Sequence, residues 1–264
     1  MEKQIVRPGC DVVYDVLPGT EDVTVVLLHG YGLHGGMWTP QIASLQSQCY
    51  PVITIDVRGH GKSRPTADFS VALAANDVHA ILDAEGVERP VLCGLSMGAF
   101  VVQEYAFQHG GATAYVLTGV TPLCIPYATW EKTLLAWSGP MMKYLYTWNS
   151  LKKAMAKGST STQEARAIVA QEFDEANKSE FLVSWSGFAT CLHEEPGFTF
   201  DAPLLVMAGE QDTRGTIKSH LPDWERHYPG CEVRTIPGAG HVANLDQPAT
   251  FDTLLGSFLK SLRD

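Results

Sequence analysis

Short runs of consecutive apolar residues recur along the chain. Residues 23–28 (VTVVLL) and 51–55 (PVITI) are rich in β-branched side chains. Such runs are typical of strands that are covered on both faces, as in a parallel sheet flanked by helices. Residues 10–17 alternate loosely between apolar and polar, which predicts a half-exposed strand. Further strands of the continuous kind are expected at 90–95, 114–118, 203–208 and 231–236.

Segments with a helical pattern fit between these strands. We expect helices at 38–47, 71–85, 97–109, 216–228 and 248–262. Alternation of strands and helices over this length predicts an α/β fold with a doubly wound, mostly parallel sheet. The core built on this sheet would comprise residues 1–121 and 196–264.

Residues 122–195 interrupt the alternation. This segment contains no strand-like run, reads as helical from end to end, and holds four of the six tryptophans. A helical insertion must pack its apolar face somewhere, and the carboxyl ends of the strands, where such sheets bind ligands, offer a surface. We therefore expect an all-helical cap, or lid, over the ligand site. Its candidate substrate-binding residues are Trp130, Trp137, Met141 and Trp185.

Composition and charge narrow the range of partners. Against 29 Asp and Glu the chain has 19 Lys and Arg, a formal net charge of −10. An acidic protein repels nucleic acid and anionic membranes, and no apolar run is long enough to span a bilayer. The six cysteines are far apart, which favours buried, reduced thiols. We expect a cytoplasmic protein that acts on a small molecule, with no nucleic acid, membrane, metal or cofactor; the pattern makes no prediction of oligomeric state.

One glycine-rich motif suggests a nucleotide site. Gly30, Gly32 and Gly35 form a GxGxxG sequence after a predicted strand, and Asp56 lies about where a dinucleotide fold places its ribose-binding acid. The bulky residues that follow Gly35 argue against the close helix packing which that fold requires. Asp56 is also followed by a glycine-rich loop rather than a simple turn. Dinucleotide binding is therefore a minor alternative.

A second motif points to nucleophilic catalysis. Ser96 is the centre of Gly94-Leu-Ser-Met-Gly98, a GxSxG sequence between a predicted strand and a predicted helix. A serine on such a sharp turn needs flanking glycines, and the helix N-terminus stabilises negative charge nearby. Its hydroxyl needs a base and an acid that orients the base. Asp212 and His241 each follow a later predicted strand, at the same edge of the sheet, and the order Ser96, Asp212, His241 is the one that this kind of sheet uses. Asp246 is expected to be a helix cap or a surface acid.

Together these motifs resemble those of the α/β-hydrolase superfamily over nearly the whole chain. The resemblance is carried by the segments 29–32 (HGYG), 56–63 (DVRGHGKS) and 94–98 (GLSMG), together with Asp212 and His241. It implies that the first glycine motif is an oxyanion loop, in which the backbone amides of Tyr31 and Met97 would be the donors. Ala99 stands where many relatives have glycine, and the segment after Asp212 lacks the proline often found there.

The resemblance implies a serine hydrolase that cleaves a carboxylic ester or lactone through a catalytic triad and an acyl-enzyme. Residues 36–41 and the 56–63 segment look most like those of oxoadipate enol-lactonases and carboxylesterases. The aromatic insertion favours a small, apolar substrate. Two alternatives remain open. Carbon–carbon bond hydrolases of ring-cleavage products use the same triad, and a ligand-binding relative would show little turnover. His29 and His60 are expected to make structural hydrogen bonds.

Overall fold

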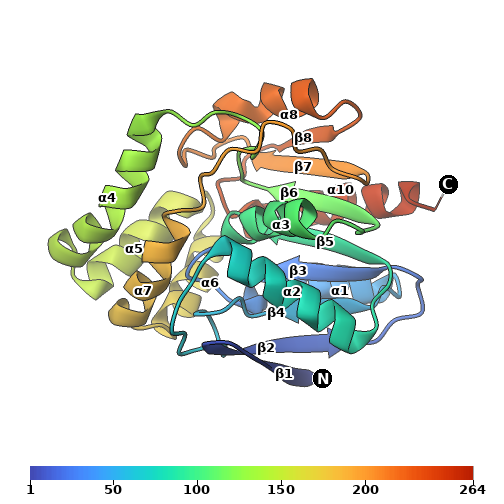
Figure 1. Cartoon of the computed structure of the whole chain (residues 1–264), viewed down its shortest axis with the longest axis horizontal. Helices are drawn as coiled ribbons and strands as arrows, with labels where there is room; N and C mark the ends of the chain where they lie inside the picture. The colour runs from blue at the N-terminus through green and yellow to red at the C-terminus, as the bar shows by residue number, and fades with distance from the viewer. Residues whose placement is uncertain (264) are drawn as a thin grey trace.

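An eight-stranded sheet forms the centre of the computed structural model, which describes residues 1–263 (Figure 1). The strands stand in the order β1-β2-β4-β3-β5-β6-β7-β8. Strands β3 to β8 pair in parallel, whereas β1 and β2 form an antiparallel edge. The bounds are β1 Glu2–Arg7, β2 Cys10–Leu17, β3 Thr24–Leu28, β4 Val52–Ile55, β5 Pro90–Leu95, β6 Ala114–Thr118, β7 Leu204–Gly209 and β8 Glu232–Ile236. The predicted doubly wound, mostly parallel sheet is confirmed.

Each predicted strand is present, but the expectation of burial on both faces is wrong for β8, which is partly exposed at the edge of the sheet. Every residue of β4, β5, β6 and β7 is buried, which is why their apolar runs are continuous. Strand β1 has no counterpart in the prediction. Its residues alternate between exposed and half-buried at the edge of the sheet, so its sequence carries no run that marks it as a strand.

Helices cover both faces of the sheet. In Figure 1, α2 and α3 lie in front of the strands and α1 and α10 behind them. The helix predicted at 216–228 is shorter than expected, because a 3₁₀ turn (Lys218–His220) occupies part of this range and α8 begins only at Leu221. Pro222 lies in the first turn of α8, where proline is tolerated. The bounds are α1 Thr39–Ser47, α2 Val71–Glu85, α3 Met97–Gln108, α8 Leu221–His227, α9 Ala243–Asp246 and α10 Pro248–Ser261, with a 3₁₀ turn at Gly35–Trp38.

Four helices lie between β6 and β7 and gather at one end of the sheet, on the left of Figure 1. They are α4 Thr129–Leu145, α5 Trp148–Ser159, α6 Gln163–Asp174 and α7 Lys178–Phe188. The expectation of helix from end to end is wrong at 122–128 and 189–195, which are irregular. Pro122 and Pro126 disfavour helix in the first of these segments. The limits of 122–195 as a domain stay a prediction.

Side-chain caps divide the insertion into separate helices. The side chains of Thr147, Thr162 and Asn177 accept backbone N–H groups from the first turns of α5, α6 and α7. Such N-caps satisfy N–H groups that have no partner within the helix. Short links of this kind let the four helices fold back on one another at the edge where the strands end.

The exposure of the cysteines and the length of the helices can be compared with the sequence expectations. Four cysteines are buried as expected, but Cys49 is exposed. Within residues 1–263, no helix combines the length and the hydrophobicity that crossing a bilayer requires.

Candidate active site

Ser96 occupies the sharp turn between β5 and α3. Its φ of +54° and ψ of −113° lie outside the regions that residues with side chains prefer, so the backbone here is strained. The Ser96 amide donates to the carbonyl of Thr118 on β6, 2.8 Å away, and fixes the turn to the neighbouring strand. Residues in strained conformations cluster at sites of function. The turn that the sequence predicts is therefore present.

The two glycines of the motif allow close approach rather than flexibility. A Cβ on Gly94 would lie 2.4 Å from the carbonyl carbon of Gly98, and a Cβ on Gly98 would lie 2.2 Å from the carbonyl oxygen of Leu28. Both distances are below van der Waals contact, so the start of α3 can pack against β3 and β5 only without side chains at these positions. This packing holds Ser96 at the carboxyl end of the sheet.

Asp212 and His241 form a hydrogen-bonded pair beside Ser96. The His241 Nδ1 lies 2.8 Å from the Asp212 Oδ2, with the Asp212 side chain fully buried and the His241 side chain 11% exposed. His241 and Ser96 line the same cavity. No hydrogen bond joins the Ser96 Oγ to the His241 Nε2 within residues 1–263; in enzymes without substrate this contact is often long. The structure thus brings the three predicted residues to one edge of the sheet.

The surroundings of Asp212 keep its carboxyl group ionised. Burial by itself raises the pKa of this group. His241, through its charge and its hydrogen bond, and the Arg214 amide outweigh burial and hold the pKa of Asp212 below its usual value. The Arg214 N–H donates to the Asp212 Oδ1 at 2.8 Å. An ionised Asp212 can accept a hydrogen bond from the Nδ1–H group of His241, which leaves Nε2 unprotonated and able to take a proton.

The backbone amides of Tyr31 and Met97, which the resemblance implies as oxyanion donors, have no hydrogen-bond partner within the described part of the chain. Met97 is the first residue of α3, where amides have no partner within the helix. Tyr31 lines the cavity next to Ser96, whereas Met97 does not line it. The Tyr31 ring is buried against Trp185 and Phe188 of the insertion, which anchors its loop.

Asp56 has a structural role rather than a ribose-binding one. Its Oδ1 accepts the Gly35 N–H at 2.8 Å, and its Oδ2 accepts the Lys62 N–H at the same distance. Both oxygens therefore join the first glycine motif to the 56–63 segment. The dinucleotide alternative would need this carboxylate to be free.

His29 makes the structural hydrogen bonds that were expected. It is fully buried between the carbonyl of Gly30, 2.9 Å from Nδ1, and the amide of Val57, which donates to Nε2 at 2.9 Å. Burial lowers its pKa to about 3, so the ring is neutral. The His60 Nδ1 lies 3.1 Å from the Arg58 carbonyl, and its Nε2 has no partner in the described part of the chain.

A cavity of about 650 Å³ lies over Ser96 and His241. Of the four predicted substrate-binding residues, Trp130 and Trp185 line it. The prediction for Trp137 and Met141 is corrected: neither lines the cavity, and they are 64% and 46% exposed. The lining face of α4 comprises Trp130, Glu131, Leu134, Leu135 and Ser138. Because no residue of α4 is buried, the spacing of its aromatic residues does not reveal which face turns inward.

Asp246 is not a surface acid, which is one of the two roles that the sequence suggests for it. It is 5% exposed rather than on the surface. Its carboxylate accepts N–H groups from Gly240 at 2.8 Å, from Ser161 at 2.9 Å and from Thr162 at 2.8 Å. Asp246 therefore ties the loop that carries His241 to the start of α6. No local sequence signal connects these two segments.

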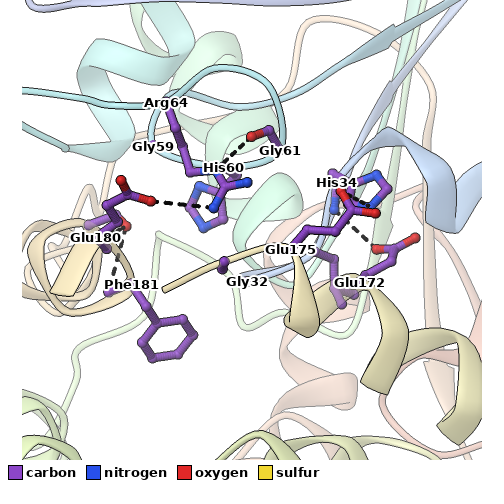
Figure 2. A pocket seen from close by; sticks show the side chains of 13 residues that line it. Gly32, His34, Gly59, His60, Gly61, Arg64, Glu172, Glu175, Glu180 and Phe181 are labelled. Atoms are coloured by element: carbon purple, nitrogen blue, oxygen red, sulfur yellow. Dashed lines mark hydrogen bonds and ion pairs between the residues drawn. The ribbon is translucent and has the colours of Figure 1, made fainter. Parts of the chain in front are cut away.

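A buried acid of the insertion joins α6 to the first glycine motif. Glu172 is 6% exposed and accepts the His34 N–H at 3.1 Å (Figure 2). Burial raises the pKa of Glu172 to about 8, and the charges of Asp56 and Glu175 add to this effect while the His34 hydrogen bond opposes it. The folded chain therefore binds a proton at neutral pH that the unfolded chain releases.

This acid gives an expected pH dependence of stability. Since the folded-state pKa of Glu172 is raised, its contribution is present at low pH and is lost as the pH rises from its usual value of 4.5 to about 8. Glu172→Gln is expected to abolish this decline, whose slope is at most about 1.4 kcal/mol per pH unit. Urea unfolding at several pH values from 5 to 9 measures it. Glu164→Gln, which removes an exposed acid from the first turn of the same helix, should keep the decline; equal slopes for wild type and Glu172→Gln would refute the assignment.

Comparisons with known proteins bear on the family and the fold of this chain. A sequence model of the alpha/beta hydrolase family matches residues 25–253. The chain is 24% identical over 241 residues to 3-oxoadipate enol-lactonase 1 of Acinetobacter baylyi, covering 90% of this chain and 89% of that enzyme. It is 25% identical over 264 residues to a putative carbamate hydrolase, RutD, of Shigella flexneri, covering 93% and 94%.

A solved structure supports the fold. A thermophilic esterase from Thermogutta terrifontis has a TM-score of 0.83 and 20% sequence identity, with 100% of both chains covered. The family sequence model extends from β3 into α10 and includes Ser96, Asp212 and His241. The chain belongs to the alpha/beta hydrolase family.

Proposed function

We propose that this protein is a serine hydrolase that cleaves ester or lactone bonds of small, largely apolar substrates. The observation that carries the proposal is the hydrogen bond of 2.8 Å between His241 and the buried Asp212, on the wall of the cavity that also exposes Ser96. This arrangement supplies a nucleophile, a base and an acid that orients the base. The relatives named above are a lactonase, a putative carbamate hydrolase and an esterase, and these names favour attack on an acyl carbon.

The chemistry follows from the positions of these groups. Ser96 Oγ attacks the carbonyl carbon while His241 Nε2 takes its proton, and the C–O bond to the alcohol breaks as His241 returns that proton to the leaving oxygen. Water, activated by His241, then releases the acid from Ser96. The amides of Tyr31 and Met97 would stabilise the oxyanion, a contribution of ~3–4 kcal/mol per donor.

Labelling with a fluorophosphonate tests the proposal directly, because this reagent forms a covalent bond with activated serines. We expect one adduct, located at Ser96 by peptide mass, and turnover of p-nitrophenyl esters with an optimum chain length. Labelling without ester turnover would favour the carbon–carbon hydrolase, which uses the same triad. Absence of both would favour a ligand-binding protein.

Asp212→Asn is expected to lower kcat by ~10² or more, but by less than removal of Ser96. An asparagine side chain can donate its NH₂ group to His241 and thereby stabilise the wrong tautomer. Steady-state kinetics with the best p-nitrophenyl ester would show a loss in kcat with little change in KM. Glu210→Gln is the control, because Glu210 lies in the same turn and its carboxylate accepts the Gly238 N–H instead. Equal rates for the two variants would argue against a role for Asp212.

A further inference from the structure

Arg214 brings a permanent positive charge to the wall of the cavity. It lines this space together with Ser96 and His241, and the other permanently charged residue of the lining is Glu131. Most of the remaining lining is apolar, with aromatic and aliphatic side chains from the insertion. Arg214 is half-buried, and withdrawing a charge from water is costly unless the charge is paired.

Few N–H groups of the Arg214 guanidinium have a partner within the described part of the protein. The backbone N–H of Arg214 binds Asp212, but its side chain forms no ion pair among residues 1–263. The Arg214 Nη2 donates to the carbonyl of Met155 on α5 at 3.1 Å. A guanidinium carries five N–H donors, so most of them have no protein acceptor here. Burial lowers the pKa of Arg214, and the charge of Asp212 acts in the opposite direction.

Glu131 does not serve as the partner of Arg214. Its Oε2 accepts the Ala128 N–H at 2.9 Å, and its Oε1 accepts the Thr216 hydroxyl at 2.9 Å. Both oxygens are therefore engaged at the start of α4. The negative charge there is held by the helix N-terminus.

Gly158 makes room for the guanidinium. A Cβ at this position on α5 would lie 2.8 Å from the Arg214 Nη2 and 3.3 Å from its Cζ. Glycine inside a helix costs roughly 1 kcal/mol relative to alanine. The α5 backbone and the end of the Arg214 side chain thus lie close together, joined by the hydrogen bond to Met155.

We propose that Arg214 binds a carboxylate of the substrate, so that the ester or lactone which this enzyme cleaves carries a carboxylate group apart from the reacting carbonyl. This inference rests on the proposed function. A carboxylate matches the paired N–H geometry of arginine, and hydrogen bonds between charged groups are the strong ones. A protein with a net charge of −10 otherwise repels anions, so a cationic residue that lines the cavity would favour such a ligand.

Two matched pairs of esters test the inference. The first pair is mono-p-nitrophenyl suberate and its neutral methyl ester, with the charge on the acyl side. The second is 4-acetoxybenzoate and its methyl ester, with the charge on the leaving group. For each pair the ratio of kcat/KM, charged over neutral, is measured. This ratio cancels any effect of a substitution on the triad, because both esters share it.

We expect the wild type to favour the charged ester in at least one pair. Arg214→Gln should lower that ratio on the order of 10- to 100-fold, mainly through KM. Gly158→Ala, which keeps the charge but displaces the guanidinium, should lower it less. Lys218→Gln is the control, because it removes an exposed charge from the same segment, outside the cavity lining, and should leave the ratio unchanged. Ratios that Arg214→Gln does not change in either pair would overturn the inference while the proposed function stands.

Binding separates this inference from the proposed function. If the wild type cleaves none of the four esters, the proposed function fails. The charged esters can then be titrated calorimetrically into Ser96→Ala and into Ser96→Ala/Arg214→Gln. Tighter binding of a charged ester to the single variant supports a carboxylate site at Arg214. Equal affinities for both variants refute it.

Discussion

Ser96→Ala is expected to lower kcat by at least ~10³ without unfolding the protein. The substitution removes the oxygen that attacks the substrate, while the amides of Tyr31 and Met97 and the cavity remain. Some catalysis over water would persist for that reason. Steady-state turnover of a p-nitrophenyl ester measures the loss, and circular dichroism with thermal unfolding follows the fold. His241→Ala should be comparably inactive. Turnover by Ser96→Ala at the rate of the wild type would exclude Ser96 as the nucleophile.

A glycine variant separates the loss of function from any loss of fold. Residue 96 has a φ of +54°, which strains alanine as much as serine. Glycine adopts positive φ at no steric cost, so Ser96→Gly should be inactive and yet at least as stable as Ser96→Ala. Ser186→Ala, which removes an exposed hydroxyl from α7, controls for the serine-to-alanine change and should keep wild-type rates. An active Ser96→Gly would contradict the proposed mechanism.

The sequence is informative about this site where local sterics or strand order dictate the outcome. Gly94 and Gly98 are required by contacts below 3 Å, and these contacts arise whenever a strand turns sharply into a helix that packs on the same sheet. Asp212 and His241 were predicted from their positions after strands. The carboxyl ends of parallel strands lie at the same edge of a sheet. Strands β7 and β8, which precede Asp212 and His241, are neighbours in the observed strand order.

Contacts between segments that are far apart in the sequence cannot be predicted from local sterics or strand order. Arg214 is positioned by a hydrogen bond to Met155 on α5, and Asp246 by hydrogen bonds from the start of α6. No local sequence pattern indicates either contact. Trp137 and Met141 belong to an aromatic helix without a buried residue, so their orientation depends on how that helix docks. Strand β1 pairs only at the edge of the sheet, where burial imposes no apolar run.

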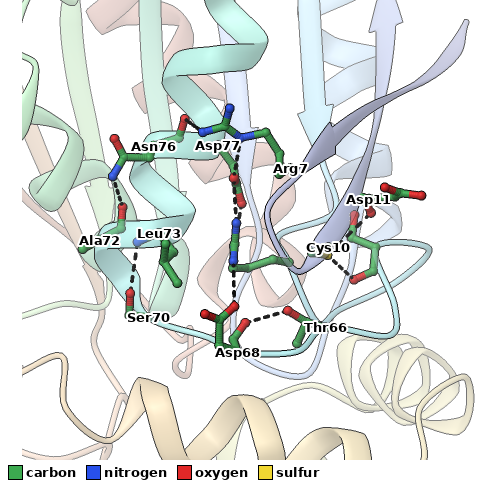
Figure 3. Close-up of polar contacts among 12 residues, drawn as sticks. Arg7, Cys10, Asp11, Thr66, Asp68, Ser70, Ala72, Leu73, Asn76 and Asp77 are labelled. Carbon is green, nitrogen blue, oxygen red and sulfur yellow. Dashed lines mark hydrogen bonds and ion pairs between the residues drawn. The ribbon is translucent and has the colours of Figure 1, made fainter.

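A buried ion pair supports the segment that underlies the site. Arg58, 1% exposed, donates to both carboxylate oxygens of Asp77 on α2, at 2.7 and 2.8 Å. Arg7 donates to the same carboxylate at 3.0 Å, and Asp68 accepts a hydrogen bond from Arg58 at 3.2 Å. In Figure 3, Asp77 lies between Arg7 and Asp68. Arg58 belongs to the 56–63 segment, whose His60 ring packs against Tyr31 at 4.9 Å. The pair thus links α2 to the proposed oxyanion loop.

Asp77→Ala is expected to destabilise the protein by about 3–5 kcal/mol, because it leaves the buried Arg58 charge with only the exposed Asp68 carboxylate, 3.2 Å away, as a partner. Urea unfolding followed by tryptophan fluorescence measures the change. Asp68→Ala is the matched control: its side chain is 62% exposed, and the loss of an exposed ion pair is worth only about 0–1 kcal/mol. If the cost arises from the unpaired charge rather than from lost packing, Arg58→Met combined with Asp77→Leu should recover much of the stability, since apolar residues of similar volume often replace buried pairs without loss. Equal destabilisation by Asp77→Ala and Asp68→Ala would show that burial of this pair does not govern its contribution.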